Sequence, residues 1–249
     1  MQIMGVRFNN WNLEESVRYL SEILDQRKRC RIFFVNAHCI NVSVRDGAYR
    51  DALTAAEIIL PDGIGMRIAG RLAGTHVRGN PNGTALFPRL CRLIQKKRRS
   101  VYFYGAQPGV AGRLADQVEI DYPGMRVAGT FLGNFTDRGT AYVLRELRGR
   151  RPDVLLVAGG VPRQERWIHK HYDSIHVPLV LGVGGLFDFY SGNKRRAPAF
   201  VRAMNLEWLH RLLLEPRRLA ARYVLGNPVF LMRAIAQALA AGSAQVDES

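Results

Sequence analysis

One carboxylate of the sequence stands where an acid–base group would be useful. Asp62 lies in LPDGIG, directly after an apolar run and directly before the apolar pattern of a helix. A carboxylate at that point could cap the helix, or it could act as a general base that takes a proton from a reacting hydroxyl group. We take Asp62 as the candidate catalytic residue and keep the capping role as the alternative.

The residues that follow other apolar runs are suited to binding. Glycine lets a backbone approach a ligand closely, and a helix that begins after it presents unpaired N–H groups to phosphate. Each such loop is a weak signal by itself, because glycine turns occur in any parallel α/β protein. The candidates are Asn36 after RIFFV, Gly105 in GAQPG after VYFY, Gly160 and Gln164 in GGVPRQE after DVLLVA, and Gly184 and Gly185 in GVGG after PLVL. The neighbouring Glu165 is explained by the dipole of the helix that it begins.

Other kinds of chemistry lack the residues that they need. His169 and His171 are two positions apart on a predicted helix and so point apart, and neither HExxH nor a strand-end Asp-x-Asp occurs. There is no GxSxG elbow, and the three cysteines have no CxxC spacing. We therefore expect no metal, no cofactor, no serine nucleophile and no disulfide scaffold, and we expect the thiols to be in a reducing cytosol.

Short apolar runs alternate with helical patterns through the first 193 residues. The runs are Arg31–Val35, Glu57–Leu60, Val101–Tyr104, Met125–Thr130, Asp153–Ala158 and Pro178–Val183. The pattern between them includes Leu13–Gln26, which Asn12 and Glu15 would begin as a capping box. This alternation predicts an α/β fold, a doubly wound Rossmann-like parallel sheet over residues 1–193. In such a sheet the residues that follow the strands meet at one end, where ligands bind.

The strands stop after Gly192. Pro198–Leu214 and Pro216–Ala240 have helical patterns, and Lys194 to Arg233 contains nine basic residues and two acids, which is +7 of the net charge of +15. We predict a basic helical appendage at 194–241 and a disordered tail at 242–249.

Three arginines of this appendage could act together. Arg211, Arg218 and Arg222 share one helical face if the helix continues through Pro216. Trp208 and Tyr223 are rings of the kind found at membrane interfaces. The alternative is a helix that packs on the core with a solvated arginine face. The charge excess favours an anionic surface, and no stretch has the roughly 20 clean apolar residues that a membrane span needs.

A pI near 10.4 calls for an anionic partner, which could be a nucleic acid, a membrane surface or a phosphorylated substrate. The basic clusters Arg27–Arg31 and Lys96–Arg99 lie where helices end before strands, and they lack the interleaved aromatic residues that stack on bases. These two clusters therefore favour a structural role over nucleic-acid binding.

Six segments in one order carry a resemblance to a known family: AEIILPDGIGMRIAG, NGTALFPRLC, VYFYGAQPGVA, DVLLVAGGVPRQERWI, LGVGGLFDFYSGNKRRAP and LEWLHRLLLEPRR. From Asn36 to Tyr223 the sequence resembles the WecG/TagA/CpsF family of bacterial glycosyltransferases. The resemblance implies transfer of a sugar from a UDP-sugar to a polyprenyl-diphosphate-linked acceptor, with inversion and without a metal. It also implies assembly of a cell-surface polymer, such as teichoic acid or exopolysaccharide, by a cytoplasmic enzyme on the inner face of the cell membrane.

Matched position by position, the resemblance makes Asp62 the general base and Asn36 and Gln164 contacts of the active site and donor. It places Arg211 and Arg218, with Arg222, over the lipid diphosphate. Gly63 and Thr84 complete the predicted substrate-binding set.

Two positions depart from the family pattern. Ala85 stands in Gly83-Thr84-Ala85 where relatives usually have aspartate, and Ala221 stands before Arg222 where relatives often have a second arginine. The run Asn80–Thr84 looks more like the GumM-like exopolysaccharide branch than the teichoic acid branch.

Two other functions compete with this one. A Rossmann oxidoreductase that uses a nucleotide sugar or NAD would need a full GxGxxG after the first strand and an acid about 20 residues later, and neither is present. A basic nucleic-acid-binding module has no visible motif. The donor sugar, the acceptor glycan, the linkage and a homo-oligomeric state stay open.

Overall fold

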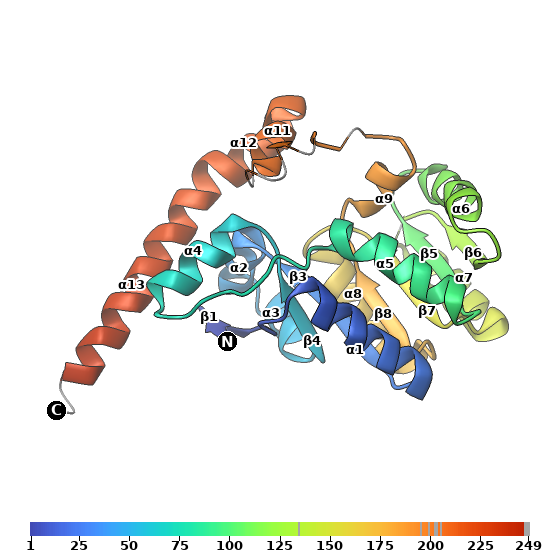
Figure 1. Ribbon diagram of the computed structural model, residues 1–249, viewed down its shortest axis with the longest axis horizontal. Coiled ribbons are helices and arrows are strands. Elements are labelled where there is room, and N and C mark those ends of the chain that lie inside the picture. The colour runs from blue at the N-terminus through green and yellow to red at the C-terminus, as the bar shows by residue number, and fades with distance from the viewer. Residues whose placement is uncertain (134, 195, 199, 202–203, 205, 247–249) are drawn as a thin grey trace.

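Six parallel strands form one sheet in the order β4-β3-β8-β7-β5-β6 (Figure 1). The strands are β3 (Cys30–Val35), β4 (Ile58–Pro61), β5 (Ser100–Gly105), β6 (Arg126–Phe131), β7 (Val154–Ala158) and β8 (Leu179–Gly182). The computed structural model describes residues 1–133, 135–194, 196–198, 200–201, 204 and 206–246. All six strands lie within a residue or two of the apolar runs in the sequence, so the predicted α/β fold with a parallel sheet is confirmed.

Helices cover both faces of the sheet because successive strand residues point to opposite sides. Phe33 and Val35 are buried on one side, and Ile32 is buried on the other. The first side is covered by α2 (Ala37–Arg45), α3 (Gly47–Thr54), α4 (Ile64–Leu72), α7 (Asp137–Arg150) and α8 (Arg163–His171). The second side is covered by α1 (Leu13–Gln26), α5 (Gly83–Lys96), α6 (Val110–Asp121) and α9 (Leu186–Tyr190). A 3₁₀ turn, η1 (Tyr172–Ser174), follows α8.

The start of α1 is the capping box that the sequence predicted. The side chain of Asn12 accepts a hydrogen bond from the backbone N–H of Glu15 at 2.9 Å, and the Glu15 carboxylate accepts one from the backbone N–H of Asn12 at 2.9 Å. The two bonds satisfy donors that a helix start would otherwise leave unpaired.

A small antiparallel hairpin, β1 (Gln2–Ile3) and β2 (Val6–Arg7), precedes α1 and was not predicted. Each strand has two residues, too few to show an alternating pattern. The chain then runs along β4, an outer strand of the sheet. The N–H of Asn9 donates to the Ile59 carbonyl at 2.7 Å, and the Asn9 side chain accepts from the Ile59 N–H at 3.0 Å. These bonds cover part of an exposed strand edge.

The appendage consists of α11 (Glu207–Leu214), α12 (Pro216–Ala220), a π-helical turn η2 (Ala221–Leu225) and α13 (Gly226–Val246). The helix does not continue through Pro216. Glu215 has φ −134° and ψ 58°, because a residue before proline is kept out of the helical region. Arg211 therefore does not share a helical face with Arg218 and Arg222, which corrects the spacing argument made from the sequence.

Helix α13 is described as far as Val246, and residues 247–249 lie outside the described part. Of the predicted helix Pro198–Leu214, residues 199, 202–203 and 205 are likewise outside it. Among the described residues, no helix combines the length and apolar character needed to cross a membrane.

Helix α13 packs on α2 and α4 and enters the core. Phe230 and Ala234 are buried in the same cluster as Phe33. The Asn41 side chain donates to the Gly226 carbonyl at 2.6 Å and accepts from Arg233 at 2.8 Å. The appendage and the α/β domain therefore share a core on that side.

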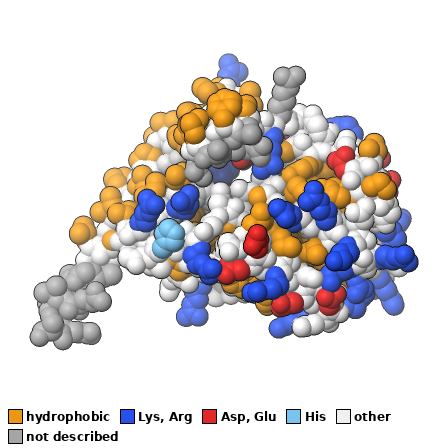
Figure 2. Space-filling model, in the orientation of Figure 1, with side chains coloured by type: hydrophobic (Ala, Val, Ile, Leu, Met, Phe, Trp, Pro, Cys, Tyr) orange, Lys and Arg blue, Asp and Glu red, His pale blue; other side chains and the backbone are white. Residues whose placement is uncertain are grey.

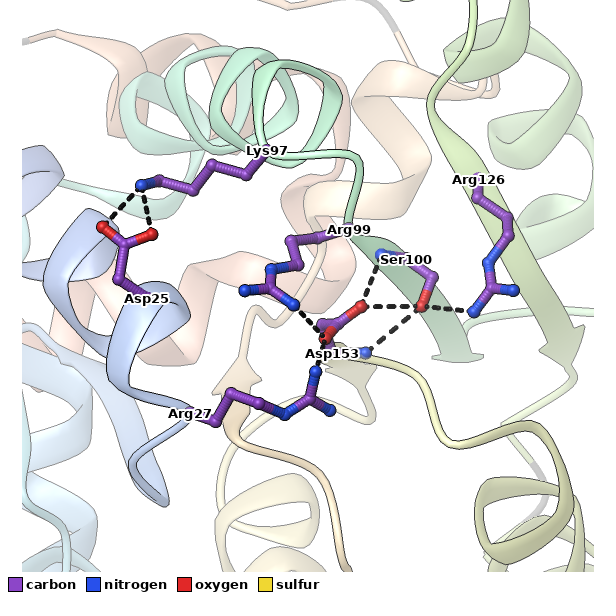
Figure 3. Close-up of polar contacts among 7 residues, drawn as sticks. All are labelled: Asp25, Arg27, Lys97, Arg99, Ser100, Arg126 and Asp153. Atoms are coloured by element: carbon purple, nitrogen blue, oxygen red, sulfur yellow. Dashed lines mark hydrogen bonds and ion pairs between the residues drawn. The ribbon is translucent and has the colours of Figure 1, made fainter.

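The opposite, amino end of the sheet is organised around Asp153 (Figure 3). Its buried carboxylate accepts hydrogen bonds from the N–H and the hydroxyl of Ser100 at 2.9 and 3.1 Å. Arg27 pairs with it at 2.9 Å and Arg99 at 3.6 Å. Arg126 donates to the Ser100 hydroxyl at 3.1 Å. Arg27 and Arg99, one from each basic cluster, therefore bind at the start of β7, and Arg126 joins β6 to β5 through Ser100.

We expect Asp153→Asn to lower the free energy of unfolding by about 2 to 3 kcal/mol, because it leaves buried donors and nearby arginines without their anion. Asp25, in the same view, is a matched control, because its side chain is 58% exposed where it pairs with Lys97 at 2.6 Å. Asp25→Asn should cost less than about 1 kcal/mol. Urea denaturation measures both values, and equal losses in the two variants would show that Asp153 is not an anchor.

Candidate active site

Asp62 and Asn36 lie side by side at the carboxyl end of the sheet, because they follow the paired strands β4 and β3. The amide nitrogen of Asn36 is 3.5 Å from a carboxylate oxygen of Asp62. The Asn36 oxygen also caps α2, accepting from the N–H groups of His38 and Cys39 at 3.1 and 3.2 Å. The amide that starts one helix therefore also orients the neighbouring carboxylate.

Asp62 does not cap the helix that follows it. The residue at the start of α4 is Gly63, with φ +88°, and no side chain caps that helix. The N–H of Gly63 donates instead to the side-chain oxygen of Asn80 at 2.9 Å. The Asp62 carboxylate is thus left for another role, which removes the capping alternative.

The surroundings of Asp62 set its affinity for a proton. Burial raises the pKa of its carboxyl group above that of a free aspartate. The hydrogen bond from Asn36 and the charges of Arg222 and Arg211 oppose this, while the charge of Glu207 adds to it. A carboxylate with a raised pKa is a stronger base, which favours a role in general base catalysis.

The amide of Gln164 connects two glycine loops. Its oxygen accepts hydrogen bonds from the N–H groups of Gly159 and Gly160 at 3.2 Å each and from that of Gly184 at 2.8 Å. Its nitrogen donates to the carboxyl group of Glu165 at 2.8 Å. Gln164 is buried, and its side chain fixes the loop after β7 to the loop after β8.

Two kinds of glycine occur at these strand ends. Gly160 and Gly184 have φ +71° and +58°, and the space beside each is open. Gly105 is different, because a Cβ on it would lie 2.3 Å from the Ala158 carbonyl oxygen. The structure therefore explains Gly105 by the close approach of β5 to β7.

Thr84 lies in the first turn of α5 and meets residues that come from beyond β8. Its hydroxyl donates to the Asn82 side chain at 2.8 Å and accepts from Arg196 at 3.0 Å. Its carbonyl accepts from the Tyr190 hydroxyl at 2.6 Å. Arg196 is not among the predicted site residues. In the sequence it is marked only by its place in the basic run before Pro198.

Two of the three predicted arginines reach this end of the sheet. Arg222 lies 3.4 Å from the Asn36 side-chain oxygen. Arg211 lies beside Gly185, 3.8 Å from the point where a side chain would begin, and over the ring of Phe189. Arg218 instead pairs with Glu215 at 2.6 Å. Asp62, Asn36, the β8 loop and two appendage arginines thus form one site.

The described residues contain no group of three or more His, Cys, Asp or Glu side chains placed to hold a metal ion. A hollow of about 770 Å³ lies elsewhere, beside the N-terminal hairpin, with Arg7, Leu53 and Glu57 among the residues that line it. None of the predicted site residues lines that hollow.

A family model described as "Glycosyl transferase WecG/TagA/CpsF family" matches residues 1–244. The chain belongs to this family. It is therefore a glycosyltransferase, as the resemblance implied, and the match extends beyond the 36–223 range that the motifs cover. The matched residues include both the strand ends of the sheet and the appendage.

Three relatives share the name N-acetylglucosaminyldiphosphoundecaprenol N-acetyl-beta-D-mannosaminyltransferase. The one from Bacillus subtilis strain 168 is 33% identical over 217 residues, covering 87% of this chain and 84% of the relative. The one from Bacillus spizizenii strain W23 is 35% identical over 195 residues, covering 78% and 75%. A Staphylococcus aureus NCTC 8325 relative is 25% identical over 235 residues, covering 94% and 91%.

The buried Glu165 gives the stability of the protein a pH dependence. Burial raises its pKa to about 7, and one of its oxygens has no hydrogen-bond partner. A raised pKa means that the folded state favours the protonated form, so this contribution to stability is present below about pH 4.5 and is lost as the pH rises to 7.

We expect the free energy of unfolding of the wild type to fall by about 2 to 3 kcal/mol more than that of Glu165→Gln between pH 5 and pH 8. Glutamine can still accept the bond from Gln164 but does not ionise. Urea denaturation at both pH values provides the test, and parallel pH profiles for the two proteins would rule out ionisation of Glu165 in this range.

Proposed function

We propose that this glycosyltransferase transfers an N-acetylhexosamine from a UDP-sugar to a saccharide on a polyprenyl diphosphate. The observation that carries the proposal is the position of Asp62, which is partly buried beside Asn36 with Arg211 and Arg222 close by. The site offers a base for a hydroxyl group and cations for a diphosphate. The names of the relatives make N-acetylmannosamine the first donor sugar to test and N-acetylglucosaminyl-diphosphoundecaprenol the first acceptor.

In the proposed reaction an acceptor hydroxyl attacks the anomeric carbon of the donor. Its proton passes to the Asp62 carboxylate, the new C–O bond forms, and the bond to UDP breaks with its electron pair leaving on the diphosphate. A single displacement of this kind inverts the anomeric centre. One positioned base contributes about 10²- to 10⁴-fold to such a step.

The departing UDP needs compensation for its charge. We assign this role to Arg211 and Arg222, which lie at the carboxyl end of the sheet beside the glycine loops after β7 and β8. Gln164 holds these loops at a fixed spacing, so we assign it a supporting role in donor binding. Fixed donors and cations of this kind suit a metal-independent transfer.

A lipid-linked acceptor requires the enzyme to reach a membrane surface. Large apolar side chains are exposed along the appendage, among them Leu213 at 74% and Leu225 at 66%, and Figure 2 shows apolar surface over α11 and α12 and along α13. The same segment of sequence carries nine basic residues against two acids. Apolar contact and basic charge together favour docking on the anionic inner leaflet. The polymer, exopolysaccharide or teichoic acid, is left to the acceptor assays.

For the base, we expect Asp62→Asn to lower kcat by at least about 10²-fold while UDP binding stays within about twofold. The wild-type rate should fall as the pH decreases through the pKa of Asp62, which burial places above that of a free aspartate, because only the ionised base accepts the proton. Release of UDP with the lipid-linked acceptor measures the rate.

Asn80→Asp, which adds a carboxylate next to Gly63, provides a comparison in which Asp62 is intact. Turnover retained in Asp62→Asn would exclude Asp62 as the base. Loss of UDP binding together with turnover would instead assign Asp62 to the donor site.

For the membrane, we expect Leu213→Ser combined with Leu225→Ser to weaken binding to vesicles containing phosphatidylglycerol by about tenfold or more, because each exposed leucine contributes burial of apolar area. Ile120→Ser is the matched control, since Ile120 is 71% exposed on α6, outside the appendage. Co-sedimentation measures binding. Equal weakening in the control, or none in the double variant, would remove the appendage from the membrane interface.

A further inference from the structure

Glu215 holds two cations at the break between α11 and α12. One of its carboxylate oxygens lies 2.8 Å from the ammonium nitrogen of Lys194, and the other lies 2.6 Å from Nε of Arg218. Each oxygen therefore serves a different cation. The side chains are partly solvated, with 26% of Glu215, 35% of Lys194 and 55% of Arg218 exposed.

This cluster borders the β8 side of the active site. Lys194 donates its backbone N–H to the Asp188 carbonyl at 2.8 Å, and its ammonium group lies 3.9 Å from the Asp188 carboxylate. Asp188 is on α9, which begins directly after Gly185. The N–H of Glu215 donates to the Arg211 carbonyl at 3.0 Å, and Arg211 lies against Gly185. The Asp188 carboxylate and the Arg211 guanidinium lie 3.9 and 3.8 Å from the same point beside Gly185, so the cluster reaches the site through Asp188 and Lys194.

We propose that the Glu215 carboxylate occupies the place of a substrate diphosphate, which displaces it and binds Lys194 and Arg218. The inference rests on the proposed function, in which both substrates carry a diphosphate. It adds Lys194 as a diphosphate-binding residue and makes Glu215 an internal competitor.

The chemistry of the groups supports such an exchange. A diphosphate, like the carboxylate, offers separate oxygens to two neighbouring cations, but it carries more negative charge and more acceptor oxygens. Exposed ion pairs are weak, so a stronger anion can replace Glu215 from solvent. Without Glu215, Lys194 and Arg218 would be neighbouring like charges, with the Asp188 carboxylate still 3.9 Å from Lys194.

The Glu215 carboxylate is ionised at every pH at which the enzyme would be assayed. The bond from Arg218, followed by that from Lys194, lowers the pKa of Glu215 to about 2. The carboxyl group therefore stays ionised across the neutral range. Diphosphate must always displace a charged group rather than a neutral one.

A purely structural ion pair predicts the opposite result. If Glu215 serves only to shape the break before Pro216, its removal loosens Lys194 and Arg218 and weakens diphosphate binding. If Glu215 competes, its removal frees the cations and strengthens binding. The direction of the change in Kd therefore decides between the two roles.

The experiment measures Kd for the full chain by isothermal titration with inorganic pyrophosphate, UDP and a short-chain polyprenyl-diphosphate N-acetylglucosamine. We expect Glu215→Gln to lower Kd about three- to tenfold for pyrophosphate and for at least one of the other two probes. Lys194→Met should raise Kd for the same probes about tenfold. Tightening for UDP alone assigns the cluster to the donor, and tightening for the lipid probe alone assigns it to the acceptor.

Glu146→Gln on α7 is the matched control, because Glu146 also pairs with an arginine, at 2.5 Å, but lies outside the described site. Its Kd values should equal those of the wild type. Glu215→Asp keeps the charge but is too short to hold both cations, so it should give intermediate tightening and covers the case in which Glu215→Gln folds poorly.

An unchanged or higher Kd for all three probes in both Glu215 variants would overturn the competition. Wild-type protein that binds pyrophosphate but neither UDP nor the lipid probe would refute the proposed function instead. The pyrophosphate measurement would then still decide whether Glu215 competes with a diphosphate.

Discussion

β8 pairs with β3 on one side and with β7 on the other, so the strand that comes last in the sequence lies in the middle of the sheet. Helices cover both faces of a parallel sheet, and neighbouring strands cover both edges of a central strand. Only the two ends of such a strand can therefore face a ligand. The chain that leaves β8 therefore starts between the loop that carries Asn36 and the loop tied down by Gln164. The appendage contributes Arg211 and Arg222 to the surroundings of Asp62 because it departs from this central point.

The site combines a rigid part and a charged part that differ in how they are held. Gln164 is buried and uses its amide oxygen for three backbone donors, so the glycine loops have a fixed spacing. Lys194, Glu215 and Arg218 of the appendage are partly solvated and held mainly by their ion pairs with one another. Strong fixation suits groups that must be in place before the donor arrives, and weak pairing suits groups that must exchange partners during binding.

The parts of this arrangement that follow from local pattern could be predicted from the sequence. Near-continuous apolar runs gave the six strands, and the strand ends located Asn36 and Asp62, because side chains after parallel strands must meet. The N-terminal hairpin has too few residues to show a period. The two helical patterns already divided at Pro216, and the shared face of the three arginines, which required a continuous helix, fails because proline keeps Glu215 out of the helical region.

Other site residues depend on tertiary contact that no local pattern encodes. Arg196 reaches Thr84 across 112 positions of sequence, and Arg222 reaches Asn36 across 186. Glu207 affects the pKa of Asp62 only because α11 lies near the strand ends. A basic run in the sequence shows that charge is present, and only the fold shows which charges meet.

The burial of Phe230 by α2 and α4 has a consequence for how the protein is made. Domains generally fold as units during synthesis, and here the central strand β8 and the core-filling helix α13 are synthesised after the elements that they pack against. During translation, the apolar faces of α2 and α4 wait for a partner helix that follows much later, since Asn41 and Gly226 are 185 positions apart. Chaperones and the nearby membrane should therefore meet folding intermediates in which the apolar faces of α2 and α4 are still uncovered.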